Sequence, residues 1–209
     1  MIGDPLILSS EDYKRAKDIW LKNKNDNDIF LIGGASGTAK SELSYCLQKT
    51  IFELDELSSI VISLDDYYFT MPSIRRYNRK KQGIDSVGLQ EVDWDYMQRI
   101  YDDYQDEKEI HLKRVHRFLD EIEHSVLNGE DIDVIIFEGL YANYLRKFYS
   151  NNFSIFLEGN PEQTLEFRKL RGKEKEEDAF RTKVVQKEFN IVSQLKRYAD
   201  LILEFKEKK

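Results

Sequence analysis

Residues 29–41 read IFLIGGASGTAKS, an apolar run followed by a glycine-containing loop and then by a lysine and a serine. This order matches the phosphate-binding pattern G-x-x-x-x-G-K-[ST] with one substitution. The backbone N–H groups of such a loop, and of the helix that follows it, converge on an anion. The stretch therefore predicts a nucleoside triphosphate site whose loop consists of Gly34, Ala35, Ser36, Gly37, Thr38, Ala39, Lys40 and Ser41.

Two side chains at the end of this loop carry the expected chemistry. Lys40 is expected to reach the β- and γ-phosphates, and the hydroxyl of Ser41 is expected to bind Mg²⁺. The substitution is Ala39, which stands where the pattern has glycine. Alanine is acceptable if residue 39 lies at the start of a right-handed helix, and it strains the loop if the residue needs a positive φ.

The composition is typical of a single soluble α/β domain. The chain has 209 residues, of which 41% are hydrophobic and 34% charged, and its net charge of −7 does not indicate a nucleic-acid-binding surface. The lone Cys46 excludes an intrachain disulfide and is expected to be a small core residue. The sequence has no long apolar run and no basic-then-apolar N-terminal signal, so we expect no membrane partner and a cytoplasmic location.

Apolar runs alternate with helical patterns along the chain, and this alternation predicts a parallel sheet covered by helices on both faces. The expected strands cover residues 28–32, 59–64, 133–137, 153–157 and 201–205, with a further short strand at 109–115. Besides the helix after the loop, helices are expected over residues 10–23, 93–104, 118–127, 161–170 and 177–196. Residues 70–92 are expected to form a long loop. We therefore predict the three-layer α/β fold of P-loop NTPases, with a five-stranded parallel sheet.

Ligands of such sheets bind beyond the carboxyl ends of the strands. Asp65 follows the second strand and is the candidate base that orients an acceptor hydroxyl; Asp66 is its competitor, because successive residues face opposite ways. Glu138 follows the third strong strand and is placed to hold Mg²⁺ directly or through water. Arg168 and Arg171 are candidates for a lid that neutralises phosphate charge and excludes water.

Four motifs together resemble the uridine/cytidine kinases and their relatives, phosphoribulokinase and bacterial pantothenate kinase. They are the phosphate loop, SLDDYY at residues 63–68, IIFEGL at residues 135–140 and RYADLI at residues 197–202. The resemblance implies ATP- and Mg²⁺-dependent phosphorylation of a primary hydroxyl, which in uridine kinases is the nucleoside 5′-hydroxyl. It implies one kinase domain over residues 1–209, with a helical extension at 1–27, a core at 28–205 and a lid at about 162–180. Relatives often form dimers or tetramers, so it also implies a homo-oligomer, although nothing in the sequence locates an interface.

The same resemblance assigns the acceptor side to three residues. Tyr68 matches the family's pocket tyrosine, Asp85 lies where the family has an acidic ribose-contacting residue, and His116 corresponds to its base-contacting histidine. The family's aromatic segment around that histidine is replaced here by HLKRVHR at residues 111–117. This change removes flat surfaces that would stack on a pyrimidine.

Two alternatives to a uridine kinase stay open. Basic residues at 75–76, 79–81 and 113–114 suit an acceptor that already carries a phosphate or carboxylate, such as a sugar phosphate or a pantothenate-like acid. Ala39 and the reduced acceptor motif would also fit a nucleotide-binding regulatory protein with little catalysis. The presence of Asp65 argues against the regulatory alternative, because a protein that only binds nucleotide needs no base.

Overall fold

The computed structural model describes residues 6–170, 172 and 178–205. Its centre is a parallel five-stranded sheet in the order β2-β5-β1-β6-β7, which confirms the predicted architecture. The strands are β1 (Ile29–Gly34), β2 (Ser59–Ser63), β5 (Val134–Glu138), β6 (Asn152–Glu158) and β7 (Leu201–Glu204). β1 is buried along its whole length, because strands flank it on both sides and helices cover both of its faces.

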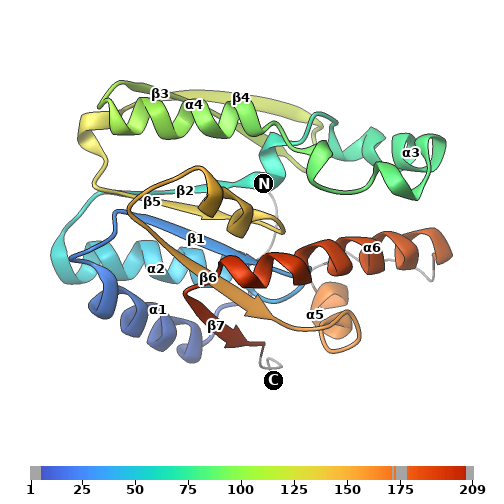
Figure 1. Ribbon diagram of the computed structural model, residues 1–209, viewed down its shortest axis with the longest axis horizontal. Coiled ribbons are helices and arrows are strands. Elements are labelled where there is room, and N and C mark those ends of the chain that lie inside the picture. The colour runs from blue at the N-terminus through green and yellow to red at the C-terminus, as the bar shows by residue number, and fades with distance from the viewer. Residues whose placement is uncertain (1–5, 171, 173–177, 206–209) are drawn as a thin grey trace.

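Alternate residues of β1 supply two separate cores. Phe30 and Ile32 pack on the face covered by α1 (Ser10–Asn23) and α2 (Lys40–Asp55), whereas Ile29 and Leu31 belong to the opposite core. That second core contains side chains of α4 (Trp94–Gln105), of strand β3 (Glu109–His116) and of α6 (Ala179–Leu195) (Figure 1). Each large side chain buried in this way contributes about 1.5–3 kcal/mol to folding.

The strands that carry the predicted chemistry end at one edge of the sheet. Glu138 at the end of β5 is in register with Ile32 of β1 and with Ser63 of β2. The loop after β1 and the short 3₁₀ helix η1 (Leu64–Tyr67) after β2 therefore meet beside the end of β5.

Helix α3 (Pro72–Gln82) occupies the segment that was predicted to be a loop, so that prediction was wrong. Pro72 lies in the first turn, where its missing N–H costs nothing, and Gly83 follows the last residue. Hydrophobic periodicity does not mark this helix, because the side chain that it buries is that of Arg79. Helix α3 packs through ion pairs instead of an apolar face, and hydrophobic periodicity does not reveal a helix of this kind.

The helix predicted over residues 118–127 was also wrong. The segment contains strand β4 (Glu121–Asn128), which pairs antiparallel with β3. Ile122 and Val126 are four residues apart and imitate helical spacing, but both are exposed on the strand. A tight turn at Asp120, with a φ of 55°, reverses the chain between β3 and β4.

The other helices agree with the predicted bounds to within two residues, except at the start of α5. Ser9 caps α1 in a capping box with Asp12, and Asp178 caps α6. Helix α5 (Leu165–Leu170) begins later than predicted, because the side chain of Asn160 accepts hydrogen bonds from backbone N–H groups in the turn before it. Across the described part of the chain, no helix is both long enough and apolar enough to cross a membrane.

Candidate active site

The phosphate loop joins the end of β1 to the first turn of α2. Gly37 has a φ of 83°, and a Cβ at this residue would lie 2.7 Å from Cγ of Arg168, so only glycine fits here. Nζ of Lys40 donates to the carbonyl oxygen of Ala35 at 2.8 Å, and Oγ1 of Thr38 donates to the same oxygen at 2.9 Å. The buried ammonium of Lys40 is thus folded back over the loop, where a bound phosphate would meet it.

Ala39 lies in the left-handed region, with φ 67° and ψ 31°. A Cβ in this conformation costs about 1–2 kcal/mol. Of the two alternatives that the sequence left open, the structure shows the strained one. The loop therefore holds residue 39 in a conformation that glycine would adopt at lower cost.

We expect Ala39→Gly to raise the free energy of unfolding by roughly 0.5–1 kcal/mol, because relief of strain exceeds the added entropy of the unfolded chain. Urea denaturation measures this change. Ala35→Gly is the matched control, since Ala35 lies in the same loop without a positive φ and should lose stability. Equal losses in both variants would show that Ala39 carries no strain.

The pair Ser41 and Glu138 lies where Mg²⁺ was predicted. Oγ of Ser41 donates to Oε2 of Glu138 at 3.3 Å, and Glu138 is buried. Oγ of Ser63, beside Glu138 in the register, is buried and has no hydrogen-bond partner among the described residues. One carboxylate and two hydroxyl oxygens, one of them without a hydrogen-bond partner among the described residues, fit Mg²⁺, which takes few protein ligands and keeps water and phosphate oxygens. The described residues hold no group of three or more histidine, cysteine or acidic side chains that would suggest another metal.

Asp65 and Asp66 diverge within η1. Asp66 is buried and accepts a hydrogen bond from the backbone N–H of Val115 at 3.1 Å, which anchors the β3–β4 hairpin. Burial raises the pKa of Asp66 to about 6. Asp65 instead lines a pocket of about 290 Å³, which Ser36 of the phosphate loop also lines. The structure thus places Asp65, rather than its neighbour, next to the loop.

Arginine dominates the lining of this pocket. Its wall comes from α3, from the end of η1, from the turn after β3, from the segment after β5 and from the start of α6. Besides Asp65 and Ser36, the lining residues are Tyr68, Pro72, Arg75, Arg76, Arg79, Arg117, Leu140, Phe180, Arg181, Val184 and Glu188. Five guanidinium groups face two carboxylates, so the pocket is suited to a ligand with negative charge.

A comparison with known families identifies the class of the protein. The model of the phosphoribulokinase/uridine kinase family matches residues 29–205. The chain belongs to this family. Membership confirms the resemblance seen in the four sequence motifs.

Curated members of the phosphoribulokinase/uridine kinase family are distant from this chain. Uridine kinase of Ureaplasma urealyticum is 28% identical over 117 residues, covering 56% of this chain and 54% of the relative. Uridine kinase of Ureaplasma parvum is 26% identical over 160 residues, covering 76% and 75%. The first of these alignments spans about half the length of the relative.

Solved structures share the family fold at lower identity. A structure from Bacillus stearothermophilus, described as a possible uridine kinase, has a TM-score of 0.62 at 18% identity and covers 91% of this chain and 98% of its own. D-glycerate 3-kinase from Cryptococcus neoformans has a TM-score of 0.56 at 12% identity, with coverages of 96% and 97%. At such identities the likeness shows the fold alone, and kinases named for different acceptors share it.

Of the three acceptor residues predicted from the family resemblance, only Tyr68 lies in the pocket with Asp65. Tyr68 lines the pocket, whereas Asp85 and His116 do not. Asp85 is 93% exposed and pairs with Lys187 at 3.3 Å, and His116 contacts Glu123 at 3.2 Å on the hairpin. Neither residue therefore has support as an acceptor contact from this geometry.

Of the two predicted lid arginines, the structure describes only Arg168. Arg168 is buried, donates to the carbonyl oxygen of Pro161 and to Oγ1 of Thr164, and packs against Gly37 of the loop. It lies beside the phosphate site but outside the pocket lining. Arg171 lies outside the described residues, as do residues 173–177 of the predicted lid.

Sequence reasoning missed the wall that α6 contributes. Arg181, Val184 and Glu188 line the pocket, although only their place in an expected helix was predicted. One signal could have found Glu188: it stands four residues after Val184 and four before Val192, within a buried stripe. A carboxylate in an apolar stripe needs a buried cationic partner, and here that partner is Arg79.

Proposed function

We propose that this protein is an ATP-dependent kinase that transfers the γ-phosphoryl group to a hydroxyl of a small molecule. The observation that carries the proposal is that Asp65 and Ser36 line one pocket, so that a base and the donor loop share one space. Membership in the phosphoribulokinase/uridine kinase family supports ATP as the donor. A cytoplasmic location, where ATP is available, is part of the same proposal.

Each residue of the site has a role in this scheme. Lys40 and the loop amides hold the phosphates, and Ser41 and Glu138 would hold Mg²⁺, which when bound neutralises phosphate charge. The carboxylate of Asp65 takes the proton of the acceptor hydroxyl while the oxygen of that hydroxyl forms a bond to the γ-phosphorus. The bond from that phosphorus to the bridging oxygen breaks, and ADP leaves. Arg168 and Arg171 are proposed to neutralise charge on the donor side.

Two acceptor classes compete. The names of the curated relatives, and Tyr68 in the pocket, support the 5′-hydroxyl of uridine or cytidine. The arginine-rich wall supports an alcohol that already carries a carboxylate or phosphate, such as a sugar phosphate or a pantothenate-like acid. The geometry favours the second class, because Asp85 and His116, the other predicted nucleoside contacts, are absent from the described lining.

The test is ADP release from ATP and Mg²⁺ with uridine, cytidine, other nucleosides, ribulose 5-phosphate, pantothenate and D-glycerate. We expect turnover with at least one acidic or phosphorylated alcohol. Turnover confined to nucleosides would replace this class with uridine kinase activity. ATP binding without turnover of any acceptor would favour the nucleotide-binding regulatory protein, and absence of ATP binding would contradict the proposal as a whole.

A further inference from the structure

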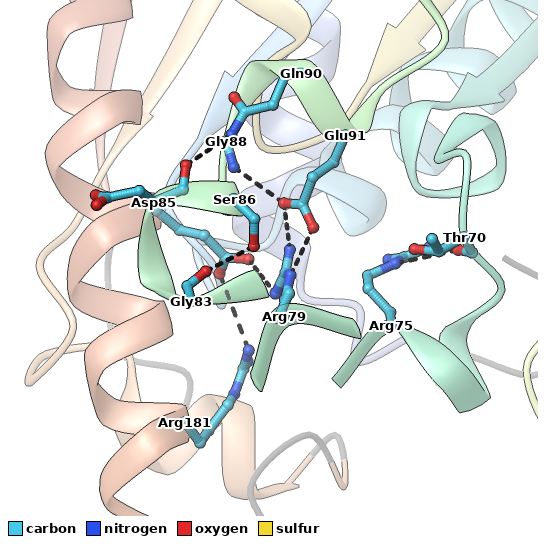
Figure 2. A network of polar contacts seen from close by, with 11 residues as sticks. Thr70, Arg75, Arg79, Gly83, Asp85, Ser86, Gly88, Gln90, Glu91 and Arg181 are labelled. Carbon is cyan, nitrogen blue, oxygen red and sulfur yellow. Dashed lines mark hydrogen bonds and ion pairs between the residues drawn. The ribbon is translucent and has the colours of Figure 1, made fainter. Parts of the chain in front are cut away.

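The five arginines of the pocket differ in what already compensates their charge. Arg79 contacts two carboxylates. Its Nε and Nη2 donate to the two carboxylate oxygens of Glu91 at 2.7 and 2.8 Å (Figure 2). Its Nη1 lies 3.0 Å from Oε1 of Glu188. Burial alone would lower the pKa of Arg79, but the bond to Glu91 and the charge of Glu188 outweigh it and raise the pKa. The two carboxylates already compensate the positive charge of Arg79, so we do not expect this guanidinium to bind a negatively charged ligand.

Three other arginines of the wall also contact neighbouring residues. Arg76 pairs with Asp178 at the surface, where the side chain of Arg76 is 63% exposed. Nη1 of Arg181 lies 3.9 Å from Oε2 of Glu188, and Arg117 donates to the carbonyl oxygen of Gly172. These contacts tie the arginines to neighbouring segments of the fold.

Arg75 is held in place without an acidic partner. Its guanidinium lies 3.9 Å from the centre of the Tyr68 ring. Its Nε and Nη2 both donate to the carbonyl oxygen of Thr70, at 3.3 and 2.9 Å (Figure 2). No carboxylate among the described residues pairs with it. Stacking and the two hydrogen bonds orient the group in advance and lower the entropy lost when it binds a ligand.

The geometry of these bonds leaves one edge of the guanidinium open. The edge formed by Nε and Nη2 is used by Thr70, so the N–H groups of Nη1 and the second N–H of Nη2 remain. Two parallel N–H groups match the oxygens of a carboxylate or a phosphate. A fixed cation with a free bidentate edge is therefore part of the pocket wall.

We infer that Arg75 binds a carboxylate or phosphate group of the acceptor and selects acceptors that carry one. The inference rests on the proposed kinase function, and it names the residue that would select acceptors by their negative charge. Arg75 serves the acceptor rather than ATP because it stacks on Tyr68, in the segment that carries Asp65, whereas Lys40 and the loop supply the donor site.

The test is calorimetric binding of ribulose 5-phosphate, D-glycerate, pantothenate and uridine to the protein saturated with ADP and Mg²⁺. We expect an anionic alcohol to bind the wild type. Arg75→Met should weaken that binding about 10- to 100-fold, while ADP affinity stays within about twofold, because only a charged hydrogen bond to the acceptor is lost. Preference for ribulose 5-phosphate would assign the anion as phosphate, and preference for the two acids as carboxylate.

Two further variants control the measurement. Arg75→Lys keeps the charge but not the fork, so it should restore part of the affinity and also serves if Arg75→Met does not fold. Arg99→Met removes another arginine that stacks on a tyrosine, Tyr96, away from the pocket, and should leave acceptor binding unchanged.

Three results would overturn the inference: binding of uridine alone, no binding of any anionic alcohol, or an Arg75→Met variant that loses ADP affinity instead of acceptor affinity. Phosphoryl transfer is measured in parallel. Arg75-dependent binding without phosphoryl transfer would contradict the proposed kinase function but support an anion-binding site at Arg75. Transfer to uridine alone would support the kinase function but contradict that anion-binding site.

Discussion

Replacing Asp65 with asparagine is expected to lower the rate of phosphoryl transfer by about 10²- to 10⁴-fold, because the amide cannot take the proton of the acceptor hydroxyl. ATP affinity should stay within about twofold, since Asp65 lines the proposed acceptor pocket, whereas the loop and Lys40 are proposed to hold the phosphates. The measurement is single-turnover transfer together with equilibrium ATP binding. Near-isosteric substitution keeps the shape of the pocket, so a loss of rate reports on chemistry.

Asp66→Asn is the matched control for this experiment. The oxygen of an asparagine side chain can still accept the hydrogen bond from the N–H of Val115, and burial disfavours the charge that the substitution removes. We therefore expect the Asp66 variant to keep transfer within a few-fold of the wild type. Unchanged turnover in Asp65→Asn, with loss in the Asp66 variant, would falsify the assignment of the base.

Arg79→Met is expected to lower the free energy of unfolding by about 3–5 kcal/mol, since it removes the cation shared by the nearly buried Glu91 and the buried Glu188. Glu188 then keeps only the more distant Arg181, at 3.9 Å. Losses of this size are a large part of the roughly 5–15 kcal/mol that stabilises an ordinary domain. Equilibrium urea denaturation at pH 7 measures the effect. The loss should greatly exceed that of a typical surface arginine because all three side chains are buried or nearly so.

Two comparisons isolate the cause of this loss. Arg76→Met removes an arginine of the same helix whose pair with Asp178 is exposed to solvent, and it should cost less than about 1 kcal/mol. Changing Glu91 and Glu188 to glutamine in the Arg79→Met background should recover part of the stability, because no buried charge then remains unpaired. If Arg79→Met costs no more than Arg76→Met, the network does not carry the stability assigned to it.

The sheet was predictable because its strands are continuous apolar runs, and burial on both faces requires such runs. Helix α3 and strand β4 were not, for opposite reasons. The buried side chain of α3 is an arginine, so the helix lacks an apolar stripe. The apolar residues of β4 are exposed and happen to follow helical spacing. In both elements, tertiary contacts override the local pattern.

The candidate site also has a part that was predictable from local sequence and a part that was not. The phosphate loop and the pair Ser41 and Glu138 are set by short motifs at strand ends, so the sequence predicted their proximity. The arginine-rich wall of the proposed acceptor pocket arises where α3 meets α6, two elements far apart in the chain, and no local motif specifies that contact. Alignment to a family pattern placed Asp85 and His116 in the acceptor site, although their described contacts lie elsewhere.

The double pairing of Arg79 has a consequence for the dimensions of the proposed acceptor pocket. One guanidinium holds η3 (Leu89–Glu91) through Glu91 and α6 through Glu188, while its own backbone belongs to α3. Separating α3 from α6 would break the buried pair between Arg79 and Glu188, so the length of this contact sets the distance between the two helices at this point. We therefore expect this wall to discriminate among acceptors by their bulk, with bulky analogues excluded even when they carry the right charge.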